Sequence, residues 1–211
     1  MIVEKRESRN WSGRVSYTLA YSRGNTSGAL TATNNMQFLN EYNLDLNEGP
    51  TDYDRRHNLV ISGRGEIPHT HGMTLSGTLR MLSGTAFSLI DTSSDPDRNG
   101  VLFDPLPAGR YSGNGANAYS VHYQGGRNGA FGPGFAQLDT RFGWRFRPGS
   151  GRTVDVSADI INVMNRSNFN NPVTSTATNA SDRRNTNFLL LTTLYGGGQP
   201  RQAQVGVRLG F

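Results

Sequence analysis

The chain has 211 residues and a net charge of +5; 35% of its residues are hydrophobic, 26 are glycine and none is cysteine. These numbers exclude disulfides and thiolate metal sites, and a composition rich in glycine and small polar residues favours strands and turns over helices. Arginines supply nearly all the positive charge, with Lys5 the single lysine, and they are scattered rather than gathered into the basic patch of a nucleic-acid-binding protein. No window of about 18 apolar residues predicts a transmembrane helix, and the opening MIVEKRESRNWSG has no apolar signal-peptide core.

Six segments alternate apolar and polar residues with the period of two that a half-exposed strand requires. In chain order they span residues 11–22, 57–67, 73–82, 137–146, 153–163 and 203–211. In the third segment, Leu75 and Leu79 fall on one face, while Ser76 and Thr78 fall on the other. A short stretch at 2–6, IVEKR, has the character of the end of an earlier strand. The pattern predicts an all-β, antiparallel fold of about six strands.

The charged residues within these segments all fall on the polar face. They are Arg14, Arg64, Glu66, Arg80, Asp139, Arg141, Arg145, Asp155, Asp159 and Arg208. Because neighbouring residues of a strand point to opposite faces, this placement leaves the other face free of charge. A sheet of this kind fits a barrel wall whose uncharged face meets lipid and whose charged face lines a wet interior.

The connections alternate between long and short. Residues 23–56, 83–136 and 164–202 form long connections, whereas 68–72 and 147–152 are tight turns containing Pro and Gly. A soluble domain seldom carries three structureless loops of this size, but transmembrane barrels have short periplasmic turns and long extracellular loops. A soluble β-sandwich would explain the alternating residues but not the alternating loop lengths. We therefore predict an antiparallel transmembrane β-barrel segment with short periplasmic turns and long extracellular loops.

Aromatic residues fall at the ends of the predicted strands. With the short turns placed in the periplasm, the periplasmic ends hold Trp11, Trp144, Phe146 and Phe211. The opposite rim holds Tyr21 and His57. Aromatic girdles at the two membrane interfaces have this placement, and strands of roughly 9–11 residues are long enough to cross a bilayer when tilted.

Three stretches of the sequence resemble the barrel of TonB-dependent outer-membrane receptors. IVEKRESRNWSGRVSYTLAYS is similar to a strand–turn–strand unit of these barrels, and GPGFAQLDTRFGWRF and VDVSADIINVMNRSNFNNP are similar to their late strands. The similarity is strongest to the large Oar-like receptors, which carry a carboxypeptidase-regulatory-like domain. The ending QVGVRLGF, with Phe211, Leu209, Val207 and Val205 at alternate positions, resembles the C-terminal signal that the barrel assembly machinery reads by strand addition.

This resemblance implies a bacterial outer-membrane receptor that binds a scarce solute outside the cell and imports it with energy delivered through TonB. The expected partners are outer-membrane lipid, the assembly machinery at the strand ending in Phe211, the extracellular solute, and TonB through an N-terminal part outside this chain. In such receptors the lumen holds a plug. The interior charges are therefore expected either to hydrogen-bond the plug or to solvate the wall and pair with one another. No catalysed reaction is expected.

The sequence also departs from the family pattern. Such receptors have a barrel of roughly 22 strands, and neither a plug nor a TonB box is found in residues 1–211. Six strands are fewer than the roughly eight that close the smallest barrels. We therefore expect residues 1–211 to be the C-terminal part of a receptor barrel, with no plug domain present. The alternatives are a small outer-membrane porin or anchor barrel formed with a partner chain, and a soluble β-sandwich binding module.

No catalytic, cofactor-binding or metal-binding residue is predicted. The stretch DPDRNG at 95–100 matches four early positions of a calcium loop. These positions are held by Asp95, Asp97, Asn99 and Gly100. The twelfth position, where such a loop needs a bidentate Glu, is Leu106, so a polar surface loop is the expectation. His69 and His71 could share a metal, but the turn offers no third ligand.

Overall fold

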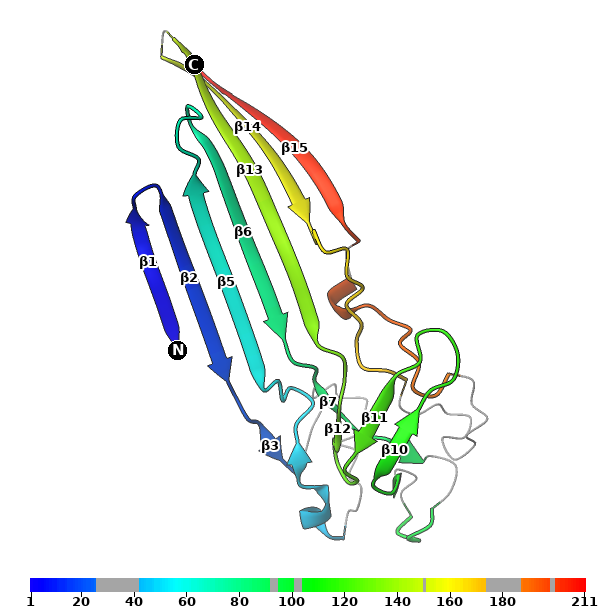
Figure 1. The fold of residues 1–211 in the computed structure, drawn as a ribbon. Helices are drawn as coiled ribbons and strands as arrows, with labels where there is room; N and C mark the ends of the chain where they lie inside the picture. Colours follow the sequence, from blue (N-terminus) through cyan, green and yellow to red (C-terminus); the bar gives the residue numbers. More distant parts are fainter. Residues whose placement is uncertain (26–41, 92–94, 101–103, 150, 174–186, 198–199) are drawn as a thin grey trace.

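A computed structural model describes residues 1–25, 42–91, 95–100, 104–149, 151–173, 187–197 and 200–211 (Figure 1). Seven strands form one antiparallel sheet in the order β1-β2-β5-β6-β13-β14-β15. Their bounds are Ile2–Ser8, Trp11–Leu19, His57–Glu66, Met73–Leu82, Phe135–Gly149, Arg152–Ile161 and Gln202–Gly210. The predicted all-β, antiparallel fold is confirmed. The stretch at 2–6 is part of a complete strand, so the sheet has seven strands rather than the six predicted.

The tight turns and the C-terminus lie at one end of the sheet (Figure 1). β1 and β2 are joined by Arg9 and Asn10, whose φ angles of 51° and 67° lie in the left-handed region. Two successive residues with positive φ make a type I′ turn, and its twist matches that of the flanking strands. The predicted turn at 68–72 joins β5, which ends at Glu66, to β6, which begins at Met73. The predicted turn at 147–152 is shorter still, because β13 ends at Gly149 and β14 begins at Arg152.

The long connections meet at the opposite end of the sheet and carry structure of their own (Figure 1). They contain four two-stranded sheets, β3–β4, β7–β12, β8–β9 and β10–β11. Their strands are Arg23–Gly24, Gly49–Pro50, Ala86–Phe87, Ile90–Asp91, Asp104–Pro105, Gly109–Ser112, Ser120–Tyr123 and Ala130–Phe131, and two 3-10 helices, η1 and η2, span Leu44–Asn47 and Tyr195–Gly197. A buried cluster of Phe87, Leu89, Tyr123, Ala130 and Leu189 forms a core. The expectation of structureless loops is therefore wrong for the described parts of the long connections, because these parts bury apolar side chains against one another. Residues 26–41, 92–94, 101–103, 174–186 and 198–199 of these connections lie outside the described residues.

Among the described residues, no helix has the length and apolar character needed to cross a membrane. The register of the large sheet instead aligns apolar residues with apolar ones and polar residues with polar ones. One row across four strands consists of Val15, Ile61, Leu79 and Leu138. The row beside it contains Ser62, Thr78 and Asp139. Because directly opposed residues of antiparallel strands share a face, these rows build one apolar face and one polar face.

The apolar face of the large sheet is not covered by the described residues. Large side chains on it stay accessible, with exposed fractions of 53% for Leu75, 40% for Phe142 and 64% for Val207. Apart from Ala136, the buried hydrophobic residues of the described chain lie in the connections. A soluble β-sandwich would bury this face against a second sheet, so the sandwich alternative is not supported. An apolar surface of this extent needs an apolar environment.

Candidate functional site

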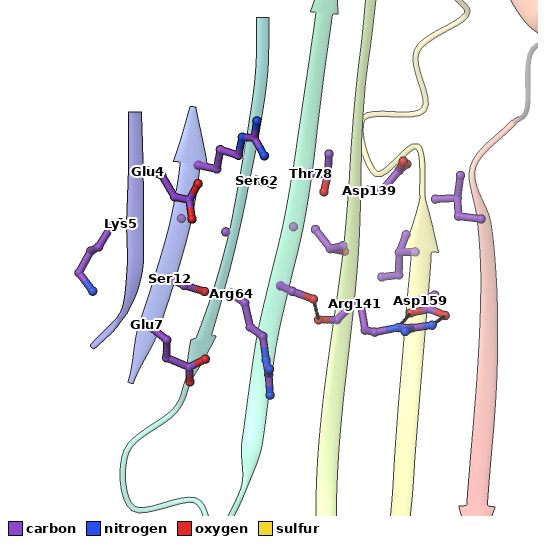
Figure 2. Close-up of a pocket in the computed structure, with 18 of the residues that line it drawn as sticks. Glu4, Lys5, Glu7, Ser12, Ser62, Arg64, Thr78, Asp139, Arg141 and Asp159 are labelled. Carbon is purple, nitrogen blue, oxygen red and sulfur yellow. Dashed lines mark hydrogen bonds and ion pairs between the residues drawn. The ribbon is translucent and has the colours of Figure 1, made fainter. Parts of the chain in front are cut away.

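The charged face of the sheet is hollowed along its length. All the charged residues predicted to share this face line one of three hollows, of about 810, 1170 and 480 Å³. Figure 2 shows the first hollow, which is lined by Arg64 from β5 and by Arg141 and Asp159 from the neighbouring strands β13 and β14. The prediction that the charges share one face is confirmed.

Two charge pairs bind β13 to β14. Arg141 and Asp159 are opposed in the register and form a bidentate pair, with one bond from Nε to Oδ1 and another of 2.7 Å from Nη2 to Oδ2. Gln204 on β15 donates to the same carboxylate at 3.0 Å. Arg145 and Asp155 form a second bidentate pair, with a bond of 2.6 Å from Nε to Oδ1 and another of 3.1 Å from Nη2 to Oδ2. The planar guanidinium matches the two carboxylate oxygens, so each pair fixes the alignment of the strands.

The other half of the polar face holds charges without partners. Within the described part of the chain, the side chains of Arg14, Arg64 and Glu66 form no hydrogen bond and no ion pair, and neither do those of Glu4 and Glu7 on β1. The expectation that interior charges pair with one another is therefore confirmed on β13 and β14. These five side chains remain available to a partner inside the lumen, although Glu4 and Arg14 are directly opposed in the register of β1 and β2.

Two buried asparagines close the backbone at the loop end of β13. Asn168, 5% exposed, accepts the Ala136 N–H at 2.9 Å and donates to the Ala136 carbonyl at 3.0 Å, as a neighbouring strand would. The side chain of Asn162, 1% exposed, accepts the backbone N–H of Arg166 and donates to its carbonyl, both at 3.1 Å. The backbone N–H of Asn162 donates to the carboxylate of Asp139. Buried backbone groups need partners, so these amides stabilise the point where the chain leaves β14. Sequence reasoning used the run INVMNRSNFNNP only for its resemblance and missed this role.

The smallest hollow lies where the polar face meets the loops. The rings of Phe135 and Tyr195 meet edge-to-face in its wall, with centroids 5.4 Å apart. The guanidinium of Arg80 lies 5.6 Å from the Phe135 ring, and that of Arg55 lies 5.0 Å from the Tyr195 ring. Aromatic faces beside cations and buried amides have the composition of a small-molecule site. Sequence reasoning missed this site, because its residues are spread over positions 55–195 and share no local pattern.

The calcium-like stretch lies in the connection between β6 and β13. The structure brings carboxylate oxygens of Asp95 and Asp97 together with one from Asp104, all within 4.8 Å of one another. Sequence reasoning tested Leu106 as the remaining ligand and missed Asp104, which the β8–β9 pairing carries to this place. His69 and His71 lie in the β5–β6 turn and belong to no group of three potential ligands among the described residues.

Aromatic side chains mark the turn end of the sheet, as predicted. Trp11 begins β2, Phe146 lies near the end of β13 and Phe211 follows β15, with exposed fractions of 51%, 48% and 97%. The Lys5 ammonium lies 3.9 Å from the centroid of the Trp11 ring, where its charge can reach the interface while its stem covers the ring. At the opposite end, His57 Nδ1 and the hydroxyl of Tyr17 are 2.8 Å apart.

An antiparallel sheet with an uncovered apolar face, a charged hollow face, tight turns at one end and folded loops at the other is the wall of a membrane β-barrel. The family model described as the outer membrane beta barrel domain matches residues 1–204. The chain belongs to this family, and its location is the bacterial outer membrane. No curated protein and no solved structure matches the chain.

Proposed function

We propose that residues 1–211 form the C-terminal part of the barrel of a TonB-dependent receptor, which imports a scarce solute across the outer membrane. The observation that carries this proposal is a set of charged side chains on the lumen face that form no hydrogen bond or ion pair in the described chain: Glu4, Glu7, Arg14, Arg64 and Glu66. In a receptor of this class a plug fills the lumen, and polar groups of the plug would bind these charges.

The edges of the sheet support a barrel with more strands. In the described residues β1 pairs only with β2, and β15 pairs only with β14. An unpaired strand edge in hydrocarbon leaves backbone groups unsatisfied, at a cost of several kcal/mol for each group. Seven strands are also fewer than the roughly eight of the smallest closed barrels. Further strands of the same longer polypeptide would pair both edges.

The proposal gives each end of the sheet a partner. The loops and the hollow at Phe135 and Tyr195 face outward and would contact the solute. The strand ending in Phe211 would bind the barrel assembly machinery, and TonB would act through an N-terminal part of the longer polypeptide. The barrel binds and conducts in this scheme, with no catalysed reaction and no nucleic acid.

Photo-crosslinking from the lumen tests the proposal. A benzoylphenylalanine at position 64 should crosslink to a plug peptide of the same polypeptide, identified by mass spectrometry. The same probe at position 61 of β5, which faces lipid, is the matched control and should give no such product. Crosslinks from position 64 only to a second copy of residues 1–211 would support the small-barrel alternative and contradict the receptor.

A second measurement separates the two barrel types. Expressed alone, residues 1–211 should not give a heat-modifiable, protease-resistant monomer in detergent, because their sheet has two open edges. Such a monomer would show that the chain closes by itself, and would refute the larger barrel.

A further inference from the structure

Three aspartates of the β6–β13 connection converge at one place, and a fourth lies on the neighbouring strand. Carboxylate oxygens of Asp95, Asp97 and Asp104 lie within 4.8 Å of one another. Asp104 on β9 is paired in register with Asp91 on β8. Asp91 and Asp104 are 9% and 6% exposed, so two of these carboxylates are withdrawn from water. Negative groups gathered this closely repel one another, and a bound cation or a shared proton relieves that repulsion.

One of these carboxylates has a buried oxygen without a partner. Oδ2 of Asp104 is inaccessible to solvent and accepts no hydrogen bond from the described residues. An unpaired buried carboxylate oxygen is expensive, and native proteins rarely leave one unsatisfied. This oxygen points to a ligand that bears positive charge.

The adjoining loop holds the other two carboxylates in place. Asp95 accepts the backbone N–H groups of Asn99 at 3.0 Å and of Gly100 at 2.9 Å. Asp97 accepts the Asn99 N–H at 3.2 Å and its side-chain amide at 2.9 Å. The loop therefore fixes both carboxylates before any ligand binds.

We propose that Asp95, Asp97 and Asp104 bind a calcium ion at the loop end of the barrel. The donors are hard carboxylate oxygens, which suit Ca²⁺ and Mg²⁺. A short acidic loop joined to a strand from elsewhere favours Ca²⁺, because Ca²⁺ accepts six to eight oxygens in flexible geometry while Mg²⁺ demands a near-ideal octahedron. Asp104 would provide the acidic ligand that a calcium loop has at its twelfth position, where this chain has Leu106. Backbone carbonyls and water would complete the ligand set.

Such a site would have a structural consequence. The ion would join the 95–100 loop to β9, in the same connection that contributes Phe87, Tyr123 and Ala130 to the loop core. Calcium binding would therefore stabilise the packed loops on the outer surface. This inference does not depend on the barrel being a TonB-dependent receptor.

Calorimetric titration of the assembled protein in detergent, freed of metal by a chelator, tests the site. Titration with CaCl₂ should show one ion bound with a dissociation constant on the order of 10⁻⁴–10⁻³ M, and MgCl₂ should bind more weakly. Asp104→Asn and Asp97→Asn should each weaken calcium binding by at least about tenfold. Asp45→Asn, an exposed loop aspartate outside the cluster, is the matched control and should bind as the unaltered protein does.

Limited proteolysis of the loops provides a second readout. Calcium should slow cleavage of the unaltered protein and of Asp45→Asn, and should have no effect on Asp104→Asn. Asp97 is exposed, so Asp97→Asn retains the fold if the buried variant does not assemble. An absence of binding heat up to about 10 mM calcium, well above the range of such sites, would overturn the proposal. Unchanged affinity in Asp97→Asn or Asp104→Asn would also overturn it.

Discussion

A charge on the apolar face of β6 should destabilise the barrel much more than the same charge one residue earlier. Leu79 lies opposite Ile61 and Leu138, so Leu79→Arg places a guanidinium among apolar side chains that face lipid. Thr78 lies opposite Asp139 on the wet face, so Thr78→Arg gives the same group a carboxylate partner. The two substitutions form a matched pair in one strand.

The size of the effect follows from the depth of Leu79. Six residues separate it from Met73, which pairs with Trp144 of the turn-end girdle. At about 3.3 Å per residue and a strand tilt of about 40°, this places Leu79 roughly 15 Å into the membrane. The apolar band of such barrels is about 25 Å tall, so Leu79 lies near its middle, where an arginine costs about 2–4 kcal/mol. Near an interface the cost would be about 0–1 kcal/mol.

Urea unfolding of the assembled barrel in phosphatidylcholine vesicles, followed by tryptophan fluorescence, measures the difference. Leu79→Arg should lower the free energy of unfolding by about 2–4 kcal/mol, and Thr78→Arg should leave it nearly unchanged. Equal losses for the two variants, or a larger loss for Thr78→Arg, would refute the assignment of the two faces.

Three further predictions concern the loop end and the C-terminus. Asn168→Ala should lower the free energy of unfolding by about 2–3 kcal/mol, because it leaves both backbone groups of Ala136 unpaired; an equal loss for Asn114→Ala, at an exposed amide in the same set of loops, would contradict this role. Leu189→Ala should open a cavity in the loop core, costing about 2–5 kcal/mol locally, and should speed protease cleavage of the loops while the sheet stays intact; cleavage at the unaltered rate would argue against a packed loop core. Deleting Phe211 should slow assembly, and unchanged outer-membrane levels would show that the assembly machinery does not read it.

The strands could be predicted because an amphipathic strand carries its pattern locally. Residues 73–82 were predicted as a strand, and β6 spans Met73–Leu82. β13 extends beyond the predicted 137–146 to Gly149, because backbone pairing with Arg152 continues past the last apolar residue. β1 is short and only partly alternating, so its pattern was too weak to predict a full strand.

The site depended on register, which the local pattern does not contain. The sequence predicted that Arg141 and Asp159 share a face, but their pairing follows from the alignment of β13 with β14. Asp104 reaches the acidic loop only because β8 pairs with β9, and no spacing rule for calcium loops would select it. Asn168 replaces a strand at a place that only the path of the folded chain defines.

The central claim is that one face of the sheet meets lipid and the other lines a wet lumen. The chain has no cysteine, so a single nitroxide label can be attached at position 79 or at position 78. In vesicles, the label at 79 should be reached by apolar oxygen and shielded from a water-soluble nickel complex, and the label at 78 should show the weaker oxygen access and stronger nickel access of a polar interior. A label at 79 that is shielded from both reagents would place this face in a protein core and contradict the barrel.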